Sequence, residues 1–180
     1  GAKVAFVQRS DASIFAAEML NKHGAEPFHM ACDITNVPTL QAAMEMAADQ
    51  HGAITVLVNN AANDTRHDLA GTDVGDWDQG MAVNLRPHFF TAQTAAPGMK
   101  AAGGGSIVNI SSAAGRIPMS GFVAYGTAKS ALSFMTREFA IEFAPRVRVN
   151  AIGVGSTETS SLGPFLDDDS RAKMEELTPM

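Results

Sequence analysis

The sequence is poor in the features that mark several common classes of protein. Cys32 is the only cysteine in 180 residues, which excludes an internal disulfide framework and a cysteine-rich zinc site, so we expect no metal. Its apolar runs are short and broken by polar residues, whereas a membrane-spanning helix needs roughly 20 apolar residues. No charged segment followed by an apolar one opens the chain, so we expect a cytoplasmic protein with no membrane partner.

Charge is also scarce. Only 18% of the residues are charged, against about 25% in ordinary soluble proteins. The net charge is −6, and Lys and Arg form no cluster, which argues against nucleic acid and anionic membrane surfaces as partners. An apolar share of 46% and a length of 180 residues predict one globular domain that spans residues 1–180.

Short β-rich runs alternate with longer helical patterns, which predicts an α/β fold with a parallel sheet. Strands are expected at residues 3–7, 27–32, 54–58, 106–110 and 146–152. Helices are expected at residues 11–23, 36–51, 73–99, 122–143 and 168–177. Pro87 should break the third helix near Asn84–Arg86. The uninterrupted apolar run at residues 54–58 is typical of a strand covered on both faces.

Tyr125 and Lys129 lie four residues apart in a predicted helix, so their side chains share one face. A tyrosine has an unperturbed pKa of about 10, and a nearby ammonium favours the phenolate, which makes the hydroxyl usable for proton transfer. Taken alone, such a pair is more often an ordinary surface pair.

Three further features lie where they could join this pair. Ser112 closes a predicted strand at the carboxyl end, where open α/β sheets place their ligands. Residues 59–62, Asn-Asn-Ala-Ala, follow the preceding predicted strand in the same way, and Asn84 lies at the predicted helix break. Each has a plain structural alternative, namely a turn serine, an asparagine-rich turn and a helix interruption.

In this order and spacing, these residues resemble the short-chain dehydrogenase/reductase family. The resemblance covers the whole chain and rests on five motifs in register: Asp33, Asn59-Asn60-Ala61, Asn84, Ser112 thirteen residues before Tyr125, and Tyr125-x-x-x-Lys129. Asn150-Ala151-Ile152 then leads to Val154-Gly155 and Thr159, where Val replaces the family's usual Pro. The resemblance implies a Rossmann-like doubly wound parallel sheet with strand order 3-2-1-4-5-6-7 and a nicotinamide cofactor.

The resemblance also implies the roles of the catalytic residues. Tyr125 would exchange a proton with the oxygen of the substrate's alcohol or carbonyl group. Lys129 would lower the pKa of Tyr125 and bond the nicotinamide ribose, and Ser112 would donate to the substrate oxygen. Asn84 would hold a water that links Lys129 to solvent. The implied reaction interconverts a secondary alcohol and a ketone, with the hydride carried by NAD or NADP.

Cofactor contacts follow from the same resemblance. Those at the adenosine end would be Asp33 and Ile34 at the adenine, and Asn59, Asn60 and Ala61 beside the ribose. Those near the carboxamide would be Gly155, Thr157 and Thr159. A carboxylate at the end of the first predicted strand would select NAD, but this chain has Gln8 and Arg9 there. An amide beside a guanidinium favours NADP over NAD, although Arg9 could also be a solvated surface residue.

The substrate class stays open among three alternatives. The loop of residues 63–67 looks like that of the family's sugar dehydrogenases. The tail from Val154 onward looks more like members that act on hydroxysteroids or 3-oxoacyl groups. Four residues could floor an apolar pocket or belong to the core: Met119, Phe122, Phe165 and Leu166. In many relatives the helices matching residues 85–102 and 122–143 carry dimer contacts, which implies a homodimer or homotetramer.

The sequence contains no Gly-x-Gly-x-x-Gly motif, although a dinucleotide-binding fold should begin with a strand, a glycine-rich turn and a helix. The stretch Gly103-Gly104-Gly105 precedes a predicted strand and does not qualify. We therefore expect a fragment of a longer reductase, incomplete at both ends, whose absent first strand would lie between the strands at 3–7 and 54–58. The alternative is a non-catalytic interaction module that does not bind the cofactor without that segment.

Overall fold

The computed structural model describes residues 1–157, 167–169 and 171–172. Strands and helices alternate as predicted: β1 (Ala5–Gln8), α1 (Ser13–His23), β2 (Phe28–Ala31), α2 (Val37–His51), β3 (Val56–Asn59), α3 (Val74–Asn84), α4 (Arg86–Ala101), β4 (Gly105–Ser112), the 3-10 helix η1 (Ala113–Gly115), α5 (Val123–Glu142) and β5 (Val147–Val154). Of the helix expected at residues 168–177, residues 168, 169, 171 and 172 are helical, and the others lie outside the described residues.

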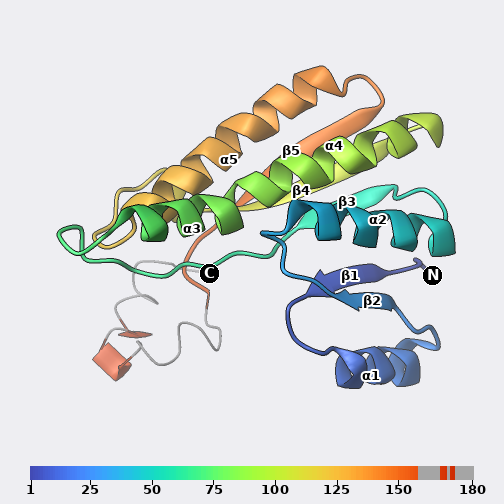
Figure 1. Cartoon of the computed structure of the whole chain (residues 1–180), viewed down its shortest axis with the longest axis horizontal. Coiled ribbons are helices and arrows are strands. Elements are labelled where there is room, and N and C mark those ends of the chain that lie inside the picture. The colour runs from blue at the N-terminus through green and yellow to red at the C-terminus, as the bar shows by residue number, and fades with distance from the viewer. Residues whose placement is uncertain (158–166, 170, 173–180) are drawn as a thin grey trace.

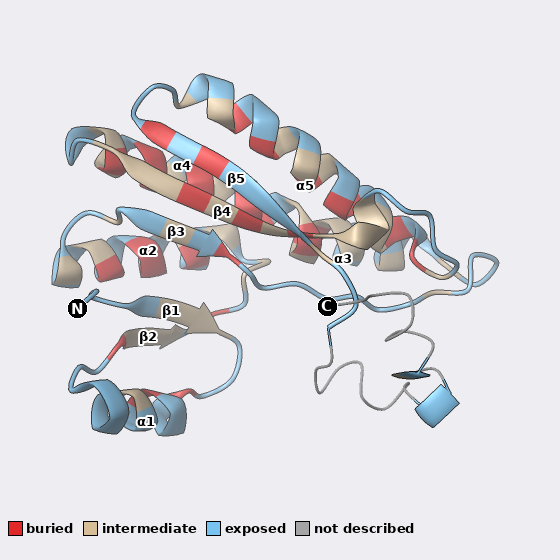
Figure 2. Cartoon of the chain, turned by 180° about the vertical axis from the view of Figure 1, so that it is seen from behind, coloured by how far each residue is buried: buried red, intermediate tan, exposed pale blue. Residues whose placement is uncertain are grey.

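The strands form two parallel sheets, with the orders β1–β2 and β3–β4–β5. In the larger sheet, Asn59 pairs with Asn109 at the carboxyl end of β3, and Ser112 pairs with Val154 at the end of β5. Within the described residues, no strand bridges β1 and β3, whose ribbons are neighbours in the view from behind (Figure 2). The described strands follow the order β2–β1 in one sheet and β3–β4–β5 in the other, which agrees with the part of the expected order that they cover.

Helices α2, α4 and α5 cover one face of the three-stranded sheet, whereas α1 lies beside β1 and β2 (Figure 1). The expectation that residues 54–58 are covered on both faces is wrong. Val56 is 62% and Val58 is 56% exposed. Side chains alternate along a strand, and Leu57 points to the helical side, where it packs against the core. In the described part of the chain, no helix covers the opposite face of β3 (Figure 2).

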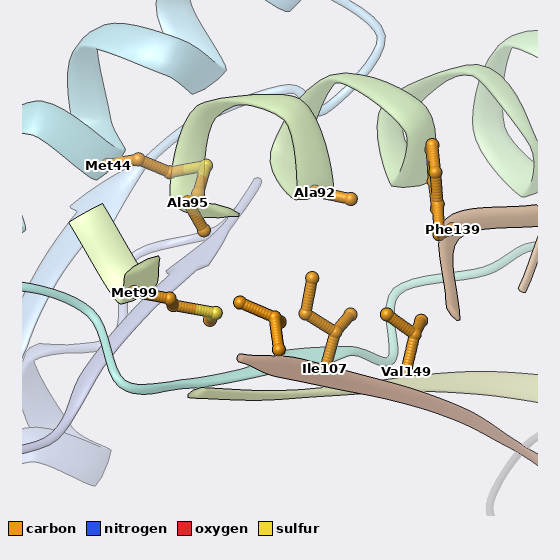
Figure 3. Close-up of a cluster of buried hydrophobic side chains, with 8 residues drawn as sticks. Met44, Ala92, Ala95, Met99, Ile107, Phe139 and Val149 are labelled. Carbon is orange, nitrogen blue, oxygen red and sulfur yellow. The ribbon is translucent and has the colours of Figure 1, made fainter. Parts of the chain in front are cut away.

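The core lies between this sheet and its helices (Figure 3). It consists of Met44, Ala92, Ala95, Met99, Ile107, Phe139, Val147 and Val149. A Cβ at residue 105 would lie 2.5 Å from the Met99 side chain, so Gly105 lets α4 pack closely on β4. Burial of one large aliphatic side chain contributes about 1.5–3 kcal/mol. This core fixes α4 and α5 against β4. Of the predicted catalytic residues, Ser112 lies at the end of β4, and Tyr125 and Lys129 lie on α5.

The predicted break between the third and fourth helical segments is confirmed. Helix α3 ends at Asn84, α4 begins at Arg86, and Leu85 between them has φ −132° and ψ −57°. Pro87 lies in the first turn of α4, where the absent N–H of proline costs nothing. The break places Asn84 and the first turn of α4 beside the carboxyl ends of β3 and β4.

Candidate active site

Two glycines bring the end of β4 close to α5. A Cβ on Gly126 would lie 2.8 Å from the Ala114 carbonyl oxygen, and a Cβ on Gly115 would lie 2.9 Å from the backbone of Lys129. Only glycine permits both approaches without displacing backbone. Ser112, which caps η1 by accepting a 3.2 Å hydrogen bond from the Ala114 N–H, is thereby held against the first turns of α5.

Tyr125 lies in the first turn of α5 and is half-buried. Burial raises its pKa above the ordinary value of 10, the nearby Ser112 hydroxyl acts to lower it, and the Asp64 carboxylate adds to the rise. The net direction is opposite to the lowering expected from Lys129. The reason is that loss of water around the Tyr125 hydroxyl outweighs the effect of Ser112.

Lys129 is 1% exposed. Its Nζ donates a 2.7 Å hydrogen bond to the Ile110 carbonyl oxygen and lies 5.7 Å from the centroid of the Tyr125 ring. Burial lowers the pKa of Lys129 from 10.5 to about 8, so the ammonium still carries most of its charge at neutral pH. The structure thus brings Ser112, Tyr125 and Lys129 together.

Asn84 is also buried, but its side chain bonds backbone. Its Oδ1 accepts from the Asn63 N–H at 2.9 Å, and its Nδ2 donates to the carbonyls of Asn63 at 2.9 Å and Gly80 at 3.0 Å. Asn84 therefore clamps the loop that follows β3 onto α3. The sequence did not predict this clamp, and it fixes one wall of the space beside Tyr125.

A cavity of about 170 Å³ lies next to this clamp. It is lined by Asn63, Thr65, His67, Asp76, Gln79, Gly80, Asn84, Ala124 and Tyr125. His67 Nδ1 lies 3.7 Å from Asp76 Oδ2 within the lining. Seven of the nine lining residues carry hydrogen-bonding side chains, so the cavity offers donors and acceptors to a bound molecule.

Of the four residues of the predicted apolar pocket floor, the structure describes Phe122 and Met119. Phe122 is 8% exposed, and its ring packs 5.6 Å from the Tyr125 ring and 4.9 Å from the Arg66 guanidinium. Met119 is 49% exposed. Phe165 and Leu166 lie outside the described residues. Phe122 is therefore a packing residue that supports Tyr125.

Asn59 takes part in a buried hydrogen-bonded chain that the sequence did not reveal. Thr91 Oγ1 donates to Asn59 Oδ1 at 2.8 Å, and Asn59 Nδ2 donates to Asn109 Oδ1 at 2.8 Å. Asn109 Nδ2 then donates to Thr136 Oγ1 at 2.9 Å. This chain ties α4 and α5 together through β3 and β4, so the Asn59 side chain is engaged inside the protein. Asn60 and Ala61 are exposed at the strand end.

The other predicted cofactor contacts lie at the carboxyl ends of β1, β2 and β5. Asp33 is exposed, and its carboxylate accepts from the Thr35 N–H at 2.9 Å and hydroxyl at 2.8 Å. These bonds, with the charge of Arg9, lower the pKa of Asp33. Ile34 is half-buried, and Gln8 Nε2 donates a hydrogen bond to the Ser10 carbonyl at 3.3 Å. Gly155 and Thr157 are exposed. Thr159 lies outside the described residues.

Parallel strands with helices packed on the sheet, and a serine, a tyrosine and a lysine at its carboxyl edge, are the arrangement of a Rossmann-like α/β protein with polar groups where such sheets bind their ligands. The family model described as short chain dehydrogenase matches residues 1–170. The chain therefore belongs to the short-chain dehydrogenase/reductase family, whose members use NAD or NADP, and it is an oxidoreductase. Among the described residues, no helix is long and apolar enough to cross a membrane.

Named relatives are similar along almost the whole chain. The chain is 39% identical over 180 residues to "Probable galactose dehydrogenase GalD" of Rhizobium meliloti (strain 1021), covering 98% of this chain and 70% of the relative. It is 37% identical over 176 residues to D-xylose 1-dehydrogenase of Caulobacter vibrioides (strain NA1000 / CB15N), covering 97% and 69%. The structure of 7α-hydroxysteroid dehydrogenase with NADH and 7-oxo glycochenodeoxycholic acid matches with a TM-score of 0.91 and 28% identity, covering 98% and 69%.

Proposed function

We propose that this chain carries the active site of an NAD(P)-dependent dehydrogenase that interconverts a secondary alcohol of a sugar or polyol and the corresponding carbonyl compound. The catalytic residues are Tyr125, Lys129, Ser112 and Asn84. The observation that supports the proposal most directly is that Ser112, Tyr125 and Lys129 lie together beside the cavity, with Lys129 Nζ 5.7 Å from the Tyr125 ring centroid and Ser112 acting on the Tyr125 hydroxyl.

Tyr125 is the acid/base of the proposed reaction. When bound, the nicotinamide would supply the hydride acceptor or donor. In the oxidation direction, the phenolate oxygen of Tyr125 takes the proton of the substrate hydroxyl, and in reduction the phenol returns it. Ser112 donates a hydrogen bond to the same substrate oxygen. Because burial raises the pKa of Tyr125, the Lys129 charge is needed to favour the phenolate.

Sugar or polyol substrates fit the cavity best. Thr65, His67, Asp76 and Gln79 present donors and acceptors that the hydroxyl groups of a sugar can bond. The apolar skeleton of a steroid or an acyl chain offers these groups few hydrogen-bond partners. Two relatives named for galactose and xylose agree with this choice. The hydroxysteroid dehydrogenase neighbour keeps the apolar alternative in the test below.

The proposed cofactor contacts lie along the carboxyl edge of the two sheets. Asp33 and Ile34 would contact the adenine, and Asn60 and Ala61, with the backbone of Asn59, would line the ribose. A Cβ at Gly155 would meet nothing within 4 Å among the described residues, so Gly155 leaves room for the carboxamide end. Thr157 and Thr159 are the further proposed contacts there. Arg9 is exposed beside the neutral Gln8, which favours NADP because a guanidinium pairs with a 2′-phosphate.

A second copy of this chain is the proposed protein partner, in a homodimer or homotetramer. The outer faces of α4 and α5 expose Phe89 (40%), Phe134 (56%) and Ile141 (74%). A shallow hollow beside Phe134 is lined by small residues, among them Gly126 and Ala131, which lets another helix approach closely. Replacement of Phe134 by Glu should shift the sedimentation coefficient toward that of the monomer.

A substrate panel tests the proposed function. Sugars, hydroxysteroids and 3-oxoacyl thioesters are offered with each nicotinamide cofactor, and turnover is followed by nicotinamide absorbance. We expect the highest kcat/KM for a sugar or polyol with NADP. A preference for a steroid or thioester would overturn the proposed substrate class. Tighter binding of NADH than of NADPH, measured by nicotinamide fluorescence, would overturn the NADP preference proposed from Arg9. If the complete protein binds neither cofactor, the non-catalytic interaction module is favoured.

A further inference from the structure

The cavity beside Tyr125 holds a carboxylate to which the proposed reaction assigns no step. Asp76 lies in the first turn of α3, with 39% of its side chain exposed, and lines the cavity. Asp78 follows two residues later on the same helix, but it is exposed and lies outside the cavity lining. An α-helix has about 3.6 residues per turn, so the two aspartates point to different sides of α3. The chain thus supplies both a cavity carboxylate and a matched surface one.

Contacts on two sides hold the Asp76 carboxylate in place. The Asp73 N–H donates to Asp76 Oδ2 at 3.2 Å, and the Asp76 N–H donates to Asp73 Oδ1 at 2.9 Å, which forms a capping box. On the cavity side, His67 Nδ1 lies 3.7 Å from the same Oδ2. Within the described residues, no group of the protein donates to Asp76 Oδ1. That oxygen is therefore held still and can accept a hydrogen bond from a bound molecule.

The facing wall of the cavity, the loop of residues 63–67, is tied down as well. Asn63 is clamped by Asn84, and its Oδ1 accepts from the Thr65 hydroxyl at 2.7 Å and N–H at 3.1 Å. The His67 N–H donates to the Gly121 carbonyl, just before α5, at 3.0 Å. The loop is thus joined both to α3 and to the segment that leads to Tyr125. Because both walls are preformed, a substrate meets Asp76 in a set position without first ordering the site.

The size and charge of the cavity limit what can bind beside Asp76. Its volume is about 170 Å³, whereas pockets for drug-sized ligands measure about 300–1,000 Å³. A single sugar ring or a short polyol is of suitable size, and no part of it would lie far from Asp76. A second carboxylate, Asp64, acts through its charge on Tyr125. Among the described residues that line the cavity there is no lysine or arginine, so a bound anion would meet like charge.

We propose that Asp76 is the specificity-determining residue of this cavity, which accepts hydrogen bonds from the hydroxyl groups of an uncharged sugar or polyol and repels derivatives that carry a carboxylate or a phosphate. The inference rests on the proposed function and narrows its substrate class to neutral compounds. A hydrogen bond to a charged acceptor is roughly twice as strong as a neutral one, which favours hydroxyl donors. Coulomb repulsion between two anions a few ångströms apart disfavours the charged derivatives.

Two sugars and two variants isolate the charge of Asp76. D-galactose and D-galacturonate share one ring and differ at C6, where the second carries a carboxylate. Asp76→Asn keeps the shape of the side chain and an oxygen that can accept from the Asp73 N–H, but it removes the charge. Asp78→Asn removes the same charge from the same helix outside the cavity, so the two variants have equal net charge. Ligand-observed NMR titration in the presence of NADP gives each dissociation constant and needs no turnover.

The two dissociation constants should move in opposite directions in Asp76→Asn. Galactose should bind about fivefold more weakly, because a charge-assisted hydrogen bond becomes a neutral one. Galacturonate should bind about threefold more tightly, because the repulsion is lost. In Asp78→Asn, both constants should stay within about twofold of the wild type. Loss of folded protein would weaken both sugars together, so it does not produce this result. Asp76→Glu keeps the charge and a side chain suited to the capping box, and it should keep the wild-type preference for galactose.

Failure of this inference and failure of the proposed function give different results. If the ratio of the two constants is the same in Asp76→Asn as in the wild type, or changes equally in Asp78→Asn, the inference is overturned even when galactose is oxidised. If the sugars bind with the expected opposite shifts but no sugar or polyol is turned over, the inference stands and the proposed reaction is overturned. A protein that binds neither sugar overturns both.

Discussion

The two sheets of this molecule differ in how firmly they hold their side chains. Around β3–β4–β5, the apolar core and the chain of bonds through Asn59 and Asn109 leave α4 and α5 little freedom. Around β1–β2, helix α1 buries Ala16 but leaves Ile14 77% and Phe15 50% exposed. Proton transfer requires atoms fixed at hydrogen-bond distance, and the candidate catalytic residues lie in the firmly packed part. The proposed adenine contacts lie at the exposed ends of the smaller sheet.

The largest effect is expected from Tyr125→Phe, which removes only the hydroxyl. We expect kcat to fall by at least about a hundredfold, the usual contribution of a positioned acid or base, while cofactor affinity stays within about twofold because the cofactor's contacts lie mostly elsewhere. Steady-state kinetics and cofactor titration on the same preparation check both. Retained turnover would remove Tyr125 from the mechanism.

Asn109→Leu should have the next largest effect, on stability. It leaves Asn59 Nδ2 and Thr136 Oγ1 buried without the partner they have now, and the expected loss in free energy of unfolding is roughly 2–4 kcal/mol. Asn150→Leu is the matched control, because Asn150 lies on β5 but is exposed, and it should change stability by no more than about 0.5 kcal/mol. Urea denaturation measures the free energy of unfolding of both variants. Equal losses would contradict the claim that the Asn109 side chain is bonded in the core whereas that of Asn150 is exposed.

Ile14→Ser on α1 should have the smallest effect. Its side chain is largely in solvent, so the free energy of unfolding should change by less than about 0.5 kcal/mol. Urea denaturation again provides the value. A loss of 2 kcal/mol or more would mean that α1 is covered in solution, and the contrast between the two sheets would then fail.

Much of the fold was predictable because the signals are local. The strand and helix alternation follows from periodicity, and the break before Arg86 follows from Pro87. The meeting of Ser112 with Tyr125 follows from a strand end and a helix start along one edge. The exposure of Val56 and Val58 was not predictable, because an apolar run does not reveal whether helices cover the second face of the sheet.

The remaining parts of the site depend on contacts between distant segments. The Asn109–Thr136 bond spans 27 residues and the Asn84–Asn63 clamp spans 21, so no local pattern announces either. The close approaches at Gly115 and Gly126 needed coordinates for the same reason. The direction of the Tyr125 pKa depends on a balance between burial and charge that spacing cannot supply.

The central claim is that the Ser112 hydroxyl acts on the Tyr125 hydroxyl, and the chain offers a direct measurement of this effect. Tyr125 is the only tyrosine in the sequence, so ultraviolet titration of tyrosinate reports its pKa alone. In the free protein this pKa should lie above 10, Ser112→Ala should raise it further by removing the effect of the serine hydroxyl, and Asp64→Asn should lower it. A tyrosine that titrates at its ordinary value and does not respond to Ser112→Ala would contradict the account.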